Sequence, residues 1–73
     1  AWILQANLDS PAEARELAAR AWEQAPLDGL VNNAAIFAPL GWNDTTLEAW
    51  ERHLRINLTA PFLLSQTFAR LLP

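Results

Sequence analysis

The sequence predicts an α/β fold in which helices cover a parallel sheet. Three patterns indicate this class: an apolar stretch at residues 1–7, an amphipathic helix pattern from residue 11, and a second short apolar stretch at residues 30–34. The order strand, helix, strand favours a right-handed crossover between two parallel strands. Of the 73 residues, 52% are hydrophobic and 18% charged, which is typical of a chain that forms a globular core.

The first helix has clear start and end signals. Residues 1–7 open with Ala-Trp-Ile-Leu, too short an apolar run for a helix, and suit a buried strand. Ser10, Pro11 and Glu13 then form the pattern of a capping box with proline at the first helical position. The helix is expected to end before Pro26. Its apolar residues recur at intervals of three and four and form one stripe: Ala14, Leu17, Ala18, Ala21, Trp22 and Ala25.

The second half of the chain repeats this arrangement. A strand at residues 30–34 follows directly, and a loop at residues 35–44 separates it from the second helix. Thr45 is the expected cap, and the helix is expected to run from about Thr46 towards Leu72. A strand-helix-strand-helix chain results.

Two strands do not make a stable parallel sheet, because each presents unpaired backbone groups along its open edge. The chain also begins inside an apolar strand and stops at Leu72-Pro73, where a further strand is expected. We therefore expect residues 1–73 to be an internal segment of a single larger domain that does not fold cooperatively alone.

Pro61 lies well inside the second predicted helix and carries no backbone N–H. In an α-helix, the N–H of residue 61 would donate to the carbonyl of Asn57. The sequence therefore predicts that this carbonyl loses its partner, that the helix kinks nearby, and that a water or another donor can occupy the free acceptor. A purely structural interpretation stays open, in which the Asn57 side chain only satisfies neighbouring backbone groups.

Residues 54–64 are apolar nearly all round the second helix, which requires more than one neighbour. One face can lie on the sheet while the opposite face meets a second subunit, so that the helix at residues 46–72 forms a homo-oligomer interface. Burial by other parts of the same protein is the alternative.

The ends of the two predicted strands carry small and amide side chains. Carboxyl ends of parallel strands border the ligand crevice of open α/β sheets, and small residues let a ligand approach the backbone. Residues 31–35 and 7–9 are placed for this role. By composition they are also ordinary loop residues, because Asn and Asp are favoured wherever strands end.

Charge and composition exclude several classes of partner. With 5 basic against 8 acidic residues, the net charge of −3 argues against nucleic acid. No apolar run approaches the ~20 residues that span a bilayer, so no membrane is expected. The absence of cysteine fits a cytoplasmic protein. His53 has no second ligand at metal spacing, so we expect a solvated or interface histidine and no metal site.

Three motifs resemble the short-chain dehydrogenase/reductase family. Val-Asn-Asn-Ala-Ala-Ile-Phe at residues 31–37 looks like its NNAG-type motif, and residues 50–62 look like the helix that carries its catalytic asparagine. Residues 6–14 resemble the strand end and helix start that hold the adenine. The resemblance implies a Rossmann-like doubly wound parallel sheet, a small-molecule substrate, and NADP or NAD as cofactor.

The resemblance also implies roles for single residues. Asn57 matches the asparagine whose main-chain carbonyl holds a water in the proton relay to a catalytic tyrosine and lysine. The segment that lies against the cofactor ribose is matched by Asn33, Ala34 and Ala35. The pair that contacts the adenine is matched by Asn7 and Leu8. Asn7 replaces the usual aspartate and Ala35 the common glycine.

The loop after the second strand is similar to that of pteridine reductases, where an aromatic at the position of Phe37 stacks on the substrate ring. The expected function of the parent protein is therefore NAD(P)-dependent reduction of a carbonyl or pterin-like heterocycle by hydride transfer. This segment would be inactive alone, because the family's glycine-rich loop and its Tyr and Lys are absent. The alternatives are a non-catalytic dinucleotide-binding regulator or scaffold and a plain helical interaction segment.

Overall fold

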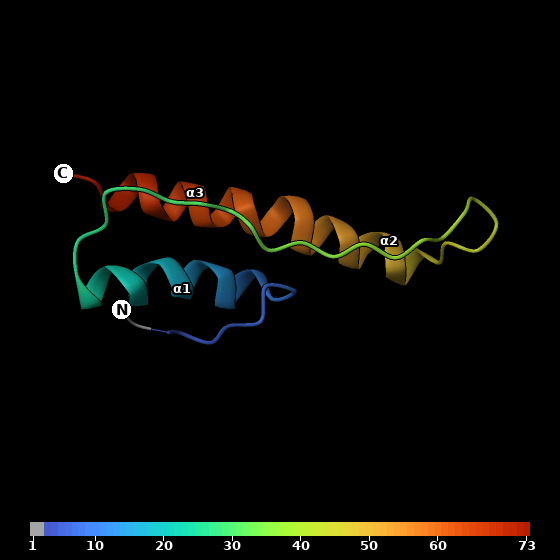
Figure 1. The fold of residues 1–73 in the computed structure, drawn as a ribbon, viewed down its shortest axis with the longest axis horizontal. Helices are drawn as coiled ribbons and strands as arrows, with labels where there is room; N and C mark the ends of the chain where they lie inside the picture. The colour runs from blue at the N-terminus through green and yellow to red at the C-terminus, as the bar shows by residue number, and fades with distance from the viewer. Residues whose placement is uncertain (1–2) are drawn as a thin grey trace.

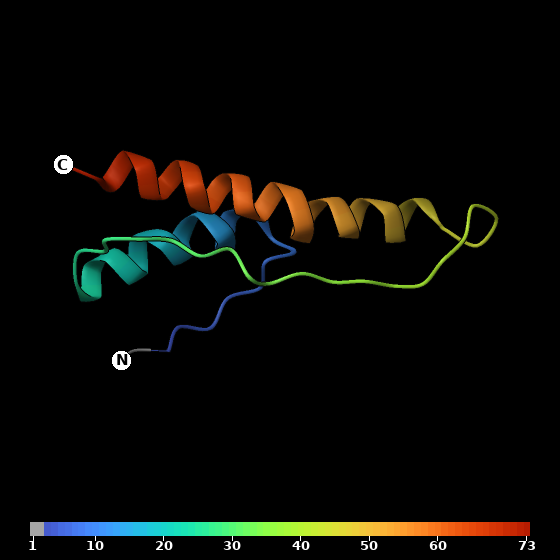
Figure 2. The same cartoon turned by 45° about the horizontal axis from the view of Figure 1, so that its top comes forward.

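The computed structural model describes residues 3–73, in which three α-helices and one π-helical turn follow one another. In chain order these are α1 (Pro11–Gln24), α2 (Leu47–Leu54), η1 (Arg55–Thr59) and α3 (Ala60–Leu71). The last three form one continuous helix, which we call the helical rod (Figure 1). α1 lies beside α3, and the chain between α1 and α2 returns along the rod without helical structure (Figure 2).

α1 begins at Pro11, as predicted, and Ser10 is its cap. Ser10 Oγ accepts the Glu13 N–H at 3.3 Å. The other half of the predicted capping box is wrong, because the Glu13 carboxylate accepts the N–H of Asn7 at 3.2 Å. The Ser10 N–H is already used in a turn, where it donates to the Asn7 carbonyl at 3.1 Å.

The helical rod begins one residue later than predicted. Thr46, not Thr45, is the cap of α2, and its Oγ1 accepts the Ala49 N–H at 3.1 Å. The Thr45 hydroxyl donates to the Gly41 carbonyl at 2.7 Å and closes the preceding loop. Both threonines suit a cap, and the loop geometry decides between them.

Neither predicted strand is present in the part of the chain that the structure describes. Residues 3–7 and 30–34 form no ladder, and residues 1 and 2 of the first predicted strand lie outside the described residues. A strand exists only when a neighbour supplies backbone partners. The expected parallel pair is therefore not formed within residues 3–73, because apolar patterning indicates burial but not which backbone supplies the ladder.

The core lies between α1 and α3. Ala14 and Ala60 are 0% and 1% exposed, so small side chains meet where the two helices are in contact. Trp22 and Phe68 extend the contact edge to face, with ring centroids 6.1 Å apart. The alanine cluster is completed by two leucines, Leu63 and Leu8.

A row of large apolar side chains on the helical rod remains exposed. Their exposed fractions lie between 37% and 71%, and they recur at intervals of three or four residues. The row consists of Leu47, Trp50, Leu54, Leu58 and Phe62. No helix within residues 3–73 has the length and apolar character required to cross a membrane.

Candidate functional site

The Asn57 side chain makes two hydrogen bonds with a single residue, Ile36. Asn57 Oδ1 accepts the Ile36 N–H at 2.9 Å, and Nδ2 donates to the Ile36 carbonyl at 2.8 Å. A residue in an antiparallel ladder exchanges the same pair of bonds with its partner. The Asn57 amide therefore replaces a neighbouring strand at this one position, and the two bonds together fix which way its oxygen and nitrogen point.

Two further side chains of the helical rod bind the same stretch of chain, residues 32–38, which we call the held segment. His53 Nε2 accepts the Ala38 N–H at 3.1 Å. Ser65 Oγ accepts a hydrogen bond from Asn32 Nδ2 at 3.3 Å. The three contacts follow the held segment and the rod in opposite directions, so the rod supports the held segment along its whole length.

The spacing of these contacts follows from the geometry of the two elements. From Asn32 to Ala38 an extended chain advances ~20 Å, at ~3.3 Å per residue. From Ser65 to His53 an α-helix advances ~18 Å, at ~1.5 Å per residue. Because the two lengths agree, one residue of the held segment matches about two residues of the rod.

The π turn η1 brings the three holding side chains onto one face of the rod. At ~100° per residue, an unbroken α-helix would place Ser65 ~120° around the axis from His53. A π turn takes up one additional residue, which removes ~100° of this rotation. The bond from the Ala60 N–H to the Arg55 carbonyl, five residues back, marks this turn. The sequence predicted a kink near Pro61, and the structure has a π turn at residues 55–59 within a continuous rod.

A turn at residues 7–10 precedes α1, and an ion pair joins it to the rod. Asn7 Oδ1 accepts the Asp9 N–H at 3.0 Å and orients the turn. The Asp9 carboxylate accepts a hydrogen bond from Arg55, the first residue of η1, and lies 4.0 Å from Arg52. The pair connects the predicted adenine-binding residues to the π turn.

The ion pair shifts the titration of both partners. The hydrogen bond from Arg55 lowers the pKa of Asp9, partly opposed by desolvation and assisted by the charges of Arg55 and Arg52. The same hydrogen bond is the main cause that raises the pKa of Arg55, with Glu51 adding to it. Asp9 is therefore a carboxylate across the neutral pH range.

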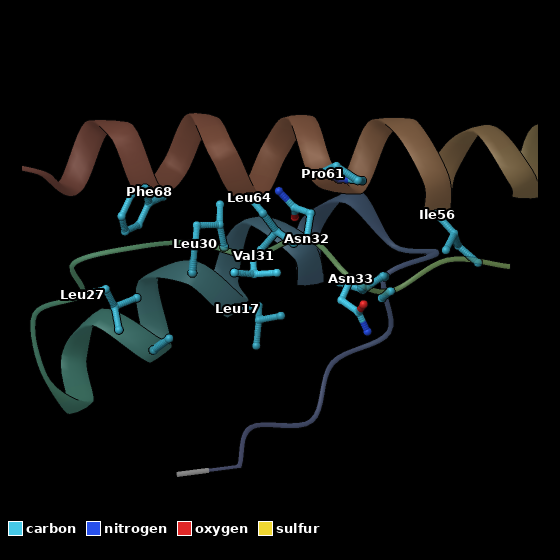
Figure 3. Close-up of a pocket in the computed structure, with 14 residues that line it drawn as sticks. Leu17, Leu27, Leu30, Val31, Asn32, Asn33, Ile56, Pro61, Leu64 and Phe68 are labelled. Carbon is cyan, nitrogen blue, oxygen red and sulfur yellow. The ribbon is translucent and has the colours of Figure 1, made fainter. Parts of the chain in front are cut away.

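The structure places the predicted cofactor and substrate residues as follows. Asn33, Ala34 and Ala35 lie in the held segment and are exposed, immediately before the residue that Asn57 binds. Asn32 is directed towards α3, whereas Asn33 lies on the opposite side of the chain (Figure 3). Phe37 is 87% exposed.

The predicted adenine residues have different surroundings. The Asn7 residue is exposed, whereas Leu8 packs against the alanine cluster of the core. The structure thus joins Asn57 directly to the held segment, and joins Asn7 and Leu8 to the rod through Asp9 and Arg55.

Sequence reasoning missed His53 and the pair formed by Asp9 and Arg55. His53 had been expected as a solvated or interface residue, but it is half-buried and binds the held segment. Its position four residues before Asn57 was the available signal, because residues four apart lie on one face of a helix. The ion pair gave no comparable signal, since 46 residues separate its partners.

An apolar cavity of about 470 Å³ lies between α1, α3 and the chain that joins α1 to the held segment (Figure 3). Leu17 lines it from α1, Leu64 and Phe68 line it from α3, and Leu30 and Val31 line it from the connecting chain. Val31 is nevertheless 87% exposed, so the cavity is open and not sealed inside the molecule.

Comparison with known proteins gives consistent matches. The model of the short chain dehydrogenase family matches residues 1–73. A short chain dehydrogenase/reductase named dpfgG from Gibberella zeae is 56% identical over 43 residues, which are 55% of this chain and 15% of that protein. An uncharacterized oxidoreductase from Thermotoga maritima is 45% identical over 40 residues, covering 55% of this chain and 16% of that protein.

A solved structure shares both fold and sequence with the chain. It is the crystal structure of a blue fluorescent protein from a metagenomic library in complex with NADPH. The match has a TM-score of 0.88 and 38% identity, and it covers 94% of this chain and 28% of that one. The chain therefore spans about a sixth of the two curated relatives and about a quarter of the solved structure.

Proposed function

Because this chain belongs to the short chain dehydrogenase family, we propose that it is an internal segment of an NAD(P)-dependent oxidoreductase. In this proposal the complete enzyme transfers a hydride to a carbonyl or a pterin-like heterocycle. Residues 1–73 form one part of a single NAD(P)-binding domain with a Rossmann-like doubly wound sheet. A cytoplasmic location is part of the proposal and rests on the cysteine-free sequence.

One observation carries the proposal: Asn57 lies within the π turn, four residues before Pro61. π turns occur frequently at functional sites, and this one precedes a residue that has no N–H to donate. The Asn57 side chain is committed to Ile36, so the peptide that carries its carbonyl is fixed relative to the held segment. We assign the carbonyl to a water in the proton relay, as the family resemblance implies.

The exposed part of the held segment suits a cofactor. Asn33, Ala34 and Ala35 present small side chains and an amide, which allow a ribose to approach the backbone. The side-chain oxygen of Asn7 accepts the Asp9 N–H, which orients the amide. The amide retains the capacity to form a further hydrogen bond with an adenine. A bound NADPH or NADH would supply the hydride, and these residues would hold and orient it.

The open apolar cavity supports the assignment of residues 1–73 to a larger domain. It lies between α1, α3 and Leu30–Val31, where a doubly wound sheet would place further strands. Strands covered on both faces are apolar, and the lining of the cavity matches them in character. We propose that strands from the remainder of the same domain fill this cavity, since the chain spans 28% of the matched structure.

The exposed apolar row on the rod supports a homo-oligomer. Leu47, Leu58 and Phe62 are each more than half exposed, which is unfavourable unless a partner covers them. We propose that a second copy of the enzyme packs its own rod against this row. Light scattering of the complete enzyme tests this, and a strict monomer would exclude it.

Turnover by the complete enzyme tests the proposed function. We expect oxidation of NADPH or NADH with at least one member of a panel of ketones and pterins. The segment alone should be inactive, because it contains neither tyrosine nor lysine. Cofactor binding without any turnover would instead identify a non-catalytic nucleotide-binding regulator or scaffold.

A further inference from the structure

Residues 36–38 are the most strongly held part of the held segment, and an exposed aromatic lies at their centre. Ile36 is bound through both its backbone groups, and Ala38 through its N–H. Phe37 lies between these anchors with 87% of its surface exposed. An aromatic ring on a backbone anchored at both sides loses little freedom when it contacts a ligand, which favours binding.

Both ring nitrogens of His53 are used. Nε2 accepts the Ala38 N–H at 3.1 Å, and Nδ1 lies 2.7 Å from the Ala49 carbonyl. A nitrogen that accepts a hydrogen bond carries no proton, so Nδ1 carries it and donates to Ala49. The two contacts therefore determine one neutral tautomer and fix the orientation of the ring.

The contact between His53 and Ala38 involves no charged side chain. The held segment carries no titratable side chain. The two nearby arginines of the rod face elsewhere, since Arg55 binds Asp9 and Arg52 lies 4.0 Å from the same carboxylate. Neither arginine contacts His53 Nε2, which accepts the Ala38 N–H.

We propose that His53 is a positioning residue: its neutral imidazole anchors the Ala38 backbone and thereby presents the Phe37 ring to a flat, conjugated substrate. The inference rests on the proposed function, and it assigns a role in substrate binding to His53, which does not touch the substrate itself. It acts through the loop backbone, so it should affect the binding of flat substrates and leave the chemical step unchanged.

Two variants of the complete enzyme test this, His53→Leu and His53→Gln. Leucine fills the space without an acceptor, whereas the glutamine amide can place one near the position of Nε2. In His53→Leu we expect the Ala38 amide to exchange with solvent about 10-fold faster, as expected for one lost hydrogen bond. The KM for a planar aromatic ketone should rise about 10-fold with kcat within about 2-fold. His53→Gln should restore most of the wild-type amide exchange rate and most of the wild-type KM.

The controls separate this inference from folding and from the proposed function. Amide exchange in α1 should be the same in all variants, and a small aliphatic ketone should show little change in KM. Unchanged Ala38 exchange in His53→Leu, or equal effects of leucine and glutamine, would overturn the inference. Failure of the wild-type enzyme to turn over any substrate would overturn the proposed function, while Ala38 exchange would still decide whether His53 anchors the loop.

Discussion

Two prolines occupy different positions in the two long helices, and their consequences differ. Pro11 is the first residue of α1, where no N–H has an intrahelical partner, so its missing donor leaves no acceptor unsatisfied. Pro61 lies in the rod, with eight residues of α2 and a π turn before it. The comparison shows that a proline alters helix chemistry only where the helix continues on both sides.

The two helices differ in regularity for the same reason. α1 is an uninterrupted α-helix whose alanines pack in the core. The rod departs from α-geometry at residues 55–59, which include Asn57 and begin at the arginine that binds Asp9. Both helices therefore contribute to the core, and the irregular one also binds the held segment.

The largest effect is expected where the rod binds the held segment. Asn57→Leu removes both bonds to Ile36 and retains the main-chain carbonyl. We expect kcat/KM of the complete enzyme to fall about 100-fold, because a displacement of ~1 Å in an active site has this effect. Asn43→Leu is a matched control, since Asn43 is an exposed loop amide. Equal activity of the two variants would show that the bonds to Ile36 are not required.

A smaller and equal effect is expected at the starts of the two helices. Ser10→Ala and Thr46→Ala each remove one side-chain cap and should each lower the free energy of unfolding by about 1 kcal/mol. Denaturant titration of the complete enzyme measures both. A much larger loss for Thr46→Ala would indicate that the rod, unlike α1, depends on its first turn.

These caps also show what the sequence could predict. Ser10, Pro11 and the apolar spacing are local signals, so α1 was predicted correctly from its first residue. The two strands expected from the sequence are not formed in residues 3–73, because a ladder depends on a neighbour that is distant in sequence. The free Asn57 carbonyl remains a prediction.

The positions of the holding side chains could not be predicted either. That His53 and Ser65 share a face depends on the additional residue in η1. The proline predicted a kink, but it did not predict a π turn within a continuous rod. The link between Asp9 and Arg55 likewise depends on the packing of α1 against α3.

The smallest effect is expected at the ion pair between Asp9 and Arg55, whose side chains are 29% and 35% exposed. The pKa of Asp9 is lowered in the folded state, so the pair stabilises the enzyme fully above the unfolded value of ~3.9. This contribution is lost as the pH falls through the folded pKa. Asp9→Asn should therefore be less stable than wild type at pH ~7, and the difference should shrink below pH ~4. A difference independent of pH would mean that Asp9 acts by packing alone.

The rate of hydride transfer in Pro61→Ala tests the central claim most directly, because alanine restores an N–H that an α-helical register would direct to the Asn57 carbonyl. Measured in a single turnover of the complete enzyme with saturating NADPH, the rate should fall about 10-fold, the equivalent of ~1.4 kcal/mol, without loss of folding stability. Pro11→Ala should leave the rate unchanged. If Pro61→Ala transfers hydride as fast as wild type, the claim that the missing donor at residue 61 keeps the Asn57 carbonyl free for the proton relay is contradicted.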